Sequence, residues 1–119
     1  MSGATTSGAT TSHLTTHVLD TATGTPAVGV EVVLERVGTP TPVATGTTDA
    51  DGRVTRLGPD VLEPGTYLLR FATGAWYAAS DTPTIFPEVC VTLTLDDPAR
   101  HYHVPLLLSP FAYSTYRGS

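Results

Sequence analysis

Apolar and polar residues alternate at every second position along most of this chain, in short runs separated by glycine and proline. Successive side chains of a strand point to opposite faces, so this period predicts strands with one face in a core. The runs lie at 13–19, 28–34, 43–48, 53–57, 65–71, 89–95, 101–108 and 112–116. About eight short strands, with turn signals at intervals of roughly 8–12 residues, predict a β-sandwich.

Ten prolines and eleven glycines in 119 residues indicate many turns, which favours an all-β fold over a helical bundle. Residues 75–80 are the best place for one short helix. The length suits a single domain. Because residues 1–12 are almost all Ser, Thr, Gly and Ala, we expect a disordered tail there and a domain over 13–119.

Charge and cysteine content exclude several classes of protein. The net charge is −5 with only six Lys and Arg, which argues against binding to nucleic acid or to a membrane surface. The start of the chain lacks the pattern of a secretory signal, and no apolar run approaches the roughly 20 residues of a membrane span. We therefore expect a cytosolic location. Cys90 is the only cysteine, which excludes an intrachain disulfide, and its alternation with core valines predicts an inert thiol.

The histidines fall on the strand faces that point away from the core. His101 and His103 are two residues apart and so share one face, while the opposite face carries the apolar residues from Tyr102 to Leu108. The same parity puts His13 and His17 outside the core. Such histidines are either solvated surface groups or part of a subunit interface, and the apolar residues beside them favour the interface.

A His-x-His pair with a third histidine is also compatible with a zinc site, because three imidazoles and an open position suit hydrolysis. No Asp or Glu lies within 101–108 to orient such ligands, which weighs against it. The acidic turn 49–52 has its glycine at the wrong position for a calcium loop.

Arg53 follows the turn formed by Asp51 and Gly52. It is either an exposed hairpin arginine or a fixed charge able to bind the oxygen of a polarised amide and keep a nearby histidine neutral. Ser109 and Ser114 have no Asp–His partners in a suitable order, so a serine nucleophile finds no support. Residues 113–119 combine two tyrosines, an arginine and a carboxylate, an unusual content for a chain end.

Four segments resemble the signatures of 5-hydroxyisourate hydrolases, a branch of the transthyretin-like family. They are Leu14–Asp20, the Asp51-Gly52-Arg53 turn, His101–Pro110 and Tyr113–Ser119. The resemblance covers residues 13–119, and the histidine and C-terminal segments carry most of it. Transthyretin itself shares the fold but differs at His103 and at the terminal Tyr-Arg-Gly-Ser.

The resemblance implies a transthyretin-like (prealbumin-like) sandwich of two four-stranded sheets with one short helix. It also implies a homotetramer, a dimer of dimers, with active sites in the channel between the dimers. The implied reaction opens the six-membered ring of 5-hydroxyisourate, giving 2-oxo-4-hydroxy-4-carboxy-5-ureidoimidazoline, without metal or cofactor. The family's catalytic residues correspond here to His17, Arg53 and His103, and its substrate-binding residues to Tyr116 and Ser119.

Our mechanistic hypothesis is that neutral His103 or His17 activates a water molecule and that Arg53 stabilises the oxyanion. The alternatives are a transthyretin-like carrier of an apolar ligand and a purely structural sandwich. The sequence does not decide which histidine is the base, which product enantiomer forms, or what the tail does.

Overall fold

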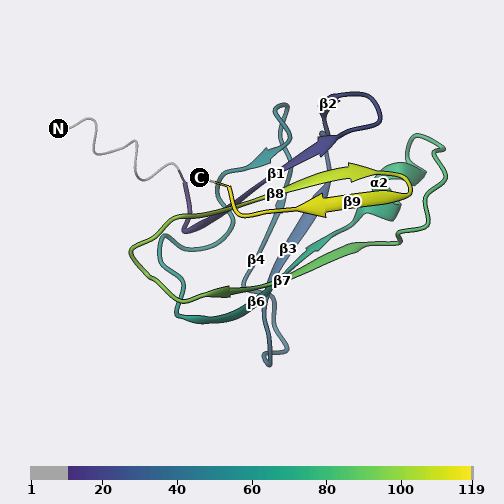
Figure 1. Ribbon diagram of the computed structural model, residues 1–119. Coiled ribbons are helices and arrows are strands. Elements are labelled where there is room, and N and C mark those ends of the chain that lie inside the picture. Colours follow the sequence, from purple (N-terminus) through teal and green to yellow (C-terminus); the bar gives the residue numbers. More distant parts are fainter. Residues whose placement is uncertain (1–10, 119) are drawn as a thin grey trace.

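The computed structural model describes residues 11–118, which form two β-sheets packed face to face (Figure 1). The first sheet contains five strands: β1 (Leu14–Asp20), β2 (Thr25–Pro26), β5 (Arg53–Val54), β8 (Tyr102–Ser109) and β9 (Ala112–Thr115). Its order is β2-β1-β8-β9, with β5 also pairing with β1. The second sheet contains β3 (Glu31–Arg36), β4 (Ala44–Thr47), β6 (Gly65–Phe71) and β7 (Val89–Leu95), in the order β4-β3-β6-β7. The expected all-β sandwich is confirmed, and the first sheet also contains β2, a short strand that the sequence did not predict.

The apolar residues that alternate along the strands are the ones buried in the structure. The face that each strand turns toward the other sheet forms one core, in which the largest fully buried side chains are Tyr67, Phe71, Leu14, Leu34, Leu57, Leu69, Leu95, Leu106 and Leu108. Removing a Leu, Val or Phe side chain from water stabilises a fold by about 1.5–3 kcal/mol, so this core holds the sheets together. The outer faces of the two sheets are not part of this core.

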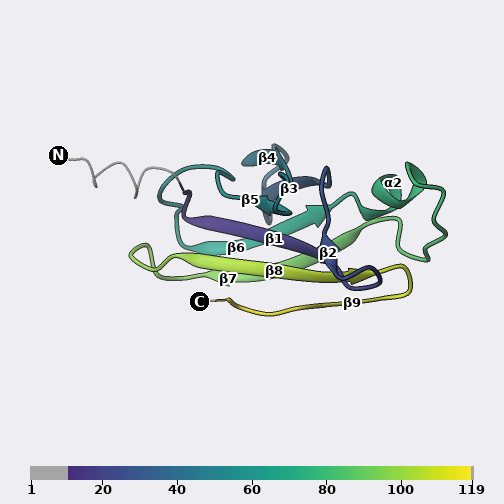
Figure 2. The ribbon, with the colours of Figure 1, turned by 90° about the horizontal axis from the view of Figure 1, so that it is seen from above.

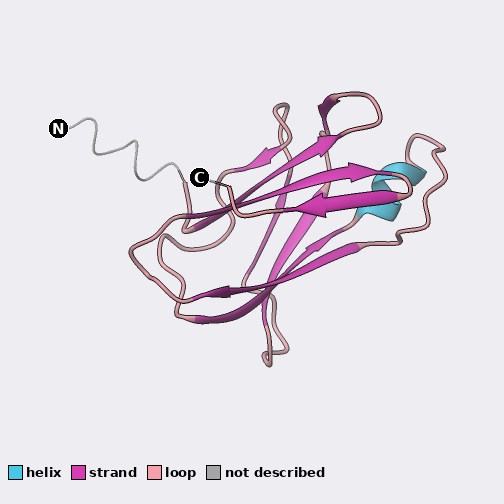
Figure 3. Cartoon of the chain, in the orientation of Figure 1, coloured by secondary structure: helices cyan, strands magenta, loops and turns pink. Residues whose placement is uncertain are grey.

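One short helix, α2 (Thr73–Ala78), lies at one end of the sandwich (Figure 3). The expected helix at 75–80 therefore exists but begins two residues earlier. Ser80 belongs to the turn that follows, where its amide donates to the carbonyl of Tyr77, and Asp81 has a positive φ of 56°. That left-handed residue prevents the helix from continuing.

Several of the predicted strands are shorter than their sequence runs, and two of them show why. Val28 was expected on the buried face of the run 28–34, but it is 52% exposed because the chain is still turning there and β3 begins only at Glu31. Gly29, with φ of 88°, makes that turn possible. The run 53–57 contributes only the two residues of β5, because the chain leaves the sheet after Val54.

The pairing of β1 with β8 is parallel, whereas the other strand pairs of the described chain are antiparallel. Figure 2 shows the two strands side by side, with β9 at the outer edge. The register of the β1–β8 pair aligns Thr15 with His103 and His17 with Pro105. Segments that are more than 80 residues apart in the sequence therefore lie next to each other in one sheet.

The start of the chain is only partly described. Residues 1–10, most of the expected tail, lie outside the described residues. Ser12 is buried, however: its hydroxyl donates to the Leu14 carbonyl (2.6 Å) and accepts from the Leu57 amide (2.8 Å). The folded part of the chain thus includes Ser12. Among the residues described, no helix is long and apolar enough to cross a membrane.

The outer face of the four-stranded sheet carries a cluster of charges around Arg70. Its guanidinium contacts the carboxylates of Glu35 (3.3 Å) and Glu88 (2.6 Å). Cys90 is exposed beside this cluster, 3.5 Å from Nη1 of Arg70, rather than facing the core. Desolvation and the Glu88 carboxylate nevertheless raise the pKa of the Cys90 thiol, which makes it a poor nucleophile.

Candidate active site

Three of the predicted site residues meet on the outer face of the five-stranded sheet. His17 of β1 lies directly opposite Arg53 of β5, and Thr15, two residues before His17, lies opposite His103 of β8. Side chains two residues apart on a strand share a face, so these four residues project to the same side. The predicted side of the sheet for His17 and His103 is confirmed by the burial of Leu14, Val18 and Val104 on the other side.

The imidazole of His103 is half-buried and bonded on one nitrogen. Its Nδ1 lies 2.8 Å from the hydroxyl oxygen of Thr15. Burial lowers the pKa of His103, and the charges of Arg53, His17 and His101 lower it further. The histidine is therefore neutral around neutral pH, which is the state that a general base requires.

His17 is anchored by the neighbouring turn. Its Nε2 donates a hydrogen bond to the carbonyl oxygen of Asp51, at 2.8 Å. A carbonyl only accepts, so this bond places a proton on Nε2 and leaves Nδ1 available in the neutral ring. The rings of His17 and His103 have centroids 6.5 Å apart and are tilted by 32°. The two imidazoles thus face a common region without bonding to each other.

Arg53 is presented by a tight turn that starts at Asp49. The Asp49 carboxylate accepts hydrogen bonds from the amides of Asp51 (2.9 Å) and Arg53 (3.0 Å), and these bonds lower the pKa of Asp49. Gly52 has φ of 76°, and a Cβ there would lie 2.5 Å from the carbonyl oxygen of Val18. The turn therefore requires glycine at 52 and sets where Arg53 leaves the backbone.

The Arg53 guanidinium forms no salt bridge with any described residue. The nearby Asp49 carboxylate is already bonded to backbone amides. A cleft of about 190 Å³ opens beside Arg53 and His103; its lining residues are Thr11, Thr15, Thr16, Arg53, Thr55, His101 and His103. A guanidinium without a salt bridge, next to a neutral imidazole, suits a reaction in which negative charge develops on a carbonyl oxygen.

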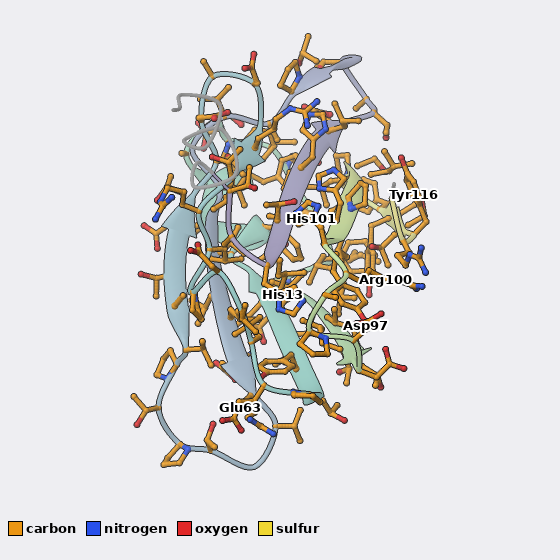
Figure 4. All side chains as sticks on the ribbon, turned by 90° about the vertical axis from the view of Figure 1, so that its left-hand side faces the viewer. His13, Glu63, Asp97, Arg100, His101 and Tyr116 are labelled. Atoms are coloured by element: carbon orange, nitrogen blue, oxygen red, sulfur yellow. The ribbon has the colours of Figure 1, made fainter. Side chains whose placement is uncertain are left out.

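The C-terminal residues Tyr116 and Gly118 have different neighbours in the single chain. Gly118 bridges to His103, donating its amide to the His103 carbonyl at 2.7 Å. Tyr116 lies at the β9 edge of the sheet and is 56% exposed (Figure 4). In the single chain it borders a separate cleft of about 220 Å³, lined by Val91, Leu93, Thr94, Tyr102, Val104, Thr115, Tyr116 and Arg117. Ser119 lies outside the described residues.

The expectation for His13 was wrong. This residue precedes β1 and is buried, because the loops before β6 and β8 cover it. Its Nδ1 accepts from the Leu62 amide (2.8 Å), and its Nε2 donates to the Asp97 carbonyl (3.3 Å). Figure 4 shows His13 near Asp97, at the end of the sandwich. Both ring nitrogens are used to hold loops together, which is a structural role.

Two further site residues emerge from the structure. Sequence reasoning passed over Thr15, whose hydroxyl contacts His103 and also His101, and it gave Gly118 no role of its own. Parity placed Thr15 on the histidine face, but only the parallel register shows that it faces His103. No group of three or more His, Cys, Asp or Glu among residues 11–118 is arranged to hold a metal ion.

The fold and the site define a transthyretin-type sandwich with a histidine–arginine cleft on its outer face. A sequence profile of the HIUase/Transthyretin family matches residues 14–118. The chain belongs to this family.

Named relatives agree with this assignment. The 5-hydroxyisourate hydrolase of Salmonella dublin is 48% identical over 100 residues, covering 82% of this chain and 74% of the relative. The structure of Klebsiella pneumoniae 5-hydroxyisourate hydrolase superposes with a TM-score of 0.82 at 40% identity, covering 89% of this chain and 98% of that one. Sea bream transthyretin in complex with thyroxine gives a TM-score of 0.80 at 31% identity, with coverages of 88% and 93%. The transthyretin-like fold expected from the sequence is confirmed.

Proposed function

We propose that this protein hydrolyses 5-hydroxyisourate to 2-oxo-4-hydroxy-4-carboxy-5-ureidoimidazoline, a step in urate degradation. The observation that carries the proposal is that neutral His103 and Arg53, which has no salt bridge to a described residue, line one cleft. Relatives of 41–48% identity that are named as hydrolases of this compound support the choice of substrate.

In the proposed mechanism Nε2 of His103 removes a proton from water as the oxygen attacks the ring carbonyl. The Arg53 guanidinium binds the oxyanion, and its charge also keeps His103 unprotonated. The proton on His103 is then given to the ring nitrogen as the carbon–nitrogen bond breaks. His17, held by the Asp51 carbonyl, orients the substrate or the water through its free Nδ1. Positioned acid–base chemistry contributes roughly 10²–10⁴-fold, which suits a substrate that is already labile in water.

We further propose that Tyr116 and Ser119 bind the polar edge of the substrate, and that the active form is a homotetramer. The support is the location of the site on an outer sheet face, where a second copy of the chain is able to cover it and exclude water. Exposed Phe111, Tyr113 and Tyr116 lie along the same edge of the sheet. The cytosolic location stays a prediction.

The test of the function is direct. The purified protein should consume freshly generated 5-hydroxyisourate far above the spontaneous rate, and treatment with EDTA should leave that rate unchanged. A rate equal to the spontaneous one contradicts the hydrolase. Loss on chelation that zinc restores contradicts the metal-free mechanism while keeping the activity.

A carrier role like that of transthyretin is the main competitor. Isothermal titration with thyroxine distinguishes the two, because a carrier binds without turnover. We expect weak or no binding, since a cleft lined by His, Arg and Thr side chains does not match an apolar ligand.

The proposed role of the terminus has its own test. A tag fused after Ser119 should impair turnover far more than the same tag placed before Met1. Equal activities of the two fusions would argue against a role for Ser119.

A further inference from the structure

The hydroxyl of Thr15 lies between two imidazoles. Its oxygen is 2.8 Å from Nδ1 of His103 and 3.1 Å from Nε2 of His101. Thr15 is buried, with only 4% of its surface exposed, whereas His101 is exposed immediately before β8. A buried hydroxyl with these two nitrogen neighbours links the half-buried ring to the exposed one.

A threonine hydroxyl has one proton, so it donates to one of the two nitrogens and accepts from the other. If Thr15 donates to His101, then Nδ1 of His103 carries a proton and donates to Thr15. The neutral His103 ring then has a free lone pair on Nε2, as a base needs. If Thr15 donates to His103 instead, the proton of the neutral ring sits on Nε2, and that nitrogen is no longer a base. The direction of one hydrogen-bond chain therefore decides whether His103 is able to act.

We propose that Thr15 and His101 are positioning residues that hold His103 in the tautomer protonated on Nδ1. This inference rests on the proposed function, because it assigns the base of that reaction. The proposal assigns to His101 the tautomer in which Nε2 accepts from the Thr15 hydroxyl, which leaves Nδ1 of His103 as the donor. Neither residue is required to touch the substrate.

Two variants of Thr15 separate the hydroxyl from the bulk of the side chain. Thr15→Val keeps the shape and removes the hydroxyl, and Thr15→Ser keeps the hydroxyl. We expect kcat to fall roughly 10- to 100-fold in Thr15→Val, with little change in KM, because an unselected tautomer loses part of the general-base contribution. Thr15→Ser should remain close to wild type.

A double-mutant cycle tests whether His101 acts through Thr15. His101→Leu removes the acceptor, so the Thr15 hydroxyl turns to His103, and kcat should fall roughly 10-fold. In the Thr15→Val background the same change should have no further effect, because the link is already broken. Independent, multiplicative losses would overturn the proposal, as would equal losses in Thr15→Val and Thr15→Ser.

The nitrogen-15 NMR signals of the His103 ring give a readout that needs no substrate. We expect a proton on Nδ1 in the wild type and in Thr15→Ser, and on Nε2 in His101→Leu. A wild-type ring protonated on Nε2 overturns the proposal whether or not the enzyme is active. A correct tautomer in a protein that does not hydrolyse 5-hydroxyisourate counts against the proposed function instead.

Discussion

The outer faces of the two sheets each present an arginine, but the two arginines have opposite surroundings. Arg70 on the four-stranded sheet lies between Glu35 and Glu88, both within 3.3 Å of its guanidinium. Arg53 on the five-stranded sheet faces His17 and has no ion-pair partner among the described residues. The first charge is neutralised by its neighbours, and the second is available to a ligand.

The difference originates in how the nearby carboxylates are used. Glu35 and Glu88 extend toward Arg70, whereas the Asp49 carboxylate next to Arg53 turns back to bind the amides of its own turn. Asp49 therefore shapes the backbone that presents Arg53 without forming a salt bridge to its guanidinium. The groups around an arginine, more than its exposure, indicate whether it serves stability or chemistry.

The largest expected effect comes from removing the base on the five-stranded sheet. His103→Asn should lower kcat for 5-hydroxyisourate by about 10³-fold, within the range of general-base contributions. Steady-state kinetics with freshly prepared substrate measure it, and circular dichroism controls for folding. A folded variant with the wild-type rate would remove His103 from the mechanism.

Replacing each of the two arginines by methionine gives a matched pair of variants. Arg53→Met should lower kcat/KM by roughly 10²-fold, since one donor to a developing oxyanion is lost. Arg70→Met removes the same charge from the other face and should leave turnover at the wild-type rate, with a slightly lower melting temperature. Similar losses of activity in both variants would mean that the comparison of the two faces is wrong.

A smaller effect is expected from the residue that packs on His103. A Cβ at Gly118 would lie 2.8 Å from Cδ2 of His103, so Gly118→Ala should displace the ring and lower kcat by about 10-fold. The melting temperature should change little, because Gly118 is not part of the buried core. An unchanged kcat would show that the ring has room to move without losing function.

The smallest effect concerns pH. The active form of His103 is neutral, so activity is present above its pKa and is lost as the pH falls through that value. The Arg53 charge is one of the causes that lower the pKa of His103, after burial. In Arg53→Met the pKa should rise, and the acid limb of the residual activity should move to higher pH. A limb that stays in place, or moves to lower pH, would contradict the electrostatic role of Arg53.

Much of the fold followed from period-two alternation, because burial on one face is a local property of a strand. The alternation predicted the core faces that contain Leu69, Leu106 and Val104, and parity put His17 and His103 outside them. The predicted burial of Val28 and the predicted exposure of His13 were wrong for the same reason. A turn or a loop takes the chain out of strand geometry there, so the alternation of faces no longer applies.

The arrangement within the site was less accessible to sequence reasoning. That Thr15 faces His103 depends on a parallel register between distant strands, and nothing local in the sequence specifies a partner. His17, Arg53 and His103 were identified through the resemblance to the family. The structure brings these three residues together on one face of the sheet. Whether Tyr116 and Ser119 act there stays a prediction.

The parallel pairing of β1 with β8 has a consequence for how the protein folds. His17 and His103 are separated by more than 80 residues of sequence. Contacts between distant segments form slowly, because a long loop must close before the contacts form. The histidine cluster therefore assembles late in folding. Recovery of turnover during refolding should accordingly follow the latest step of folding.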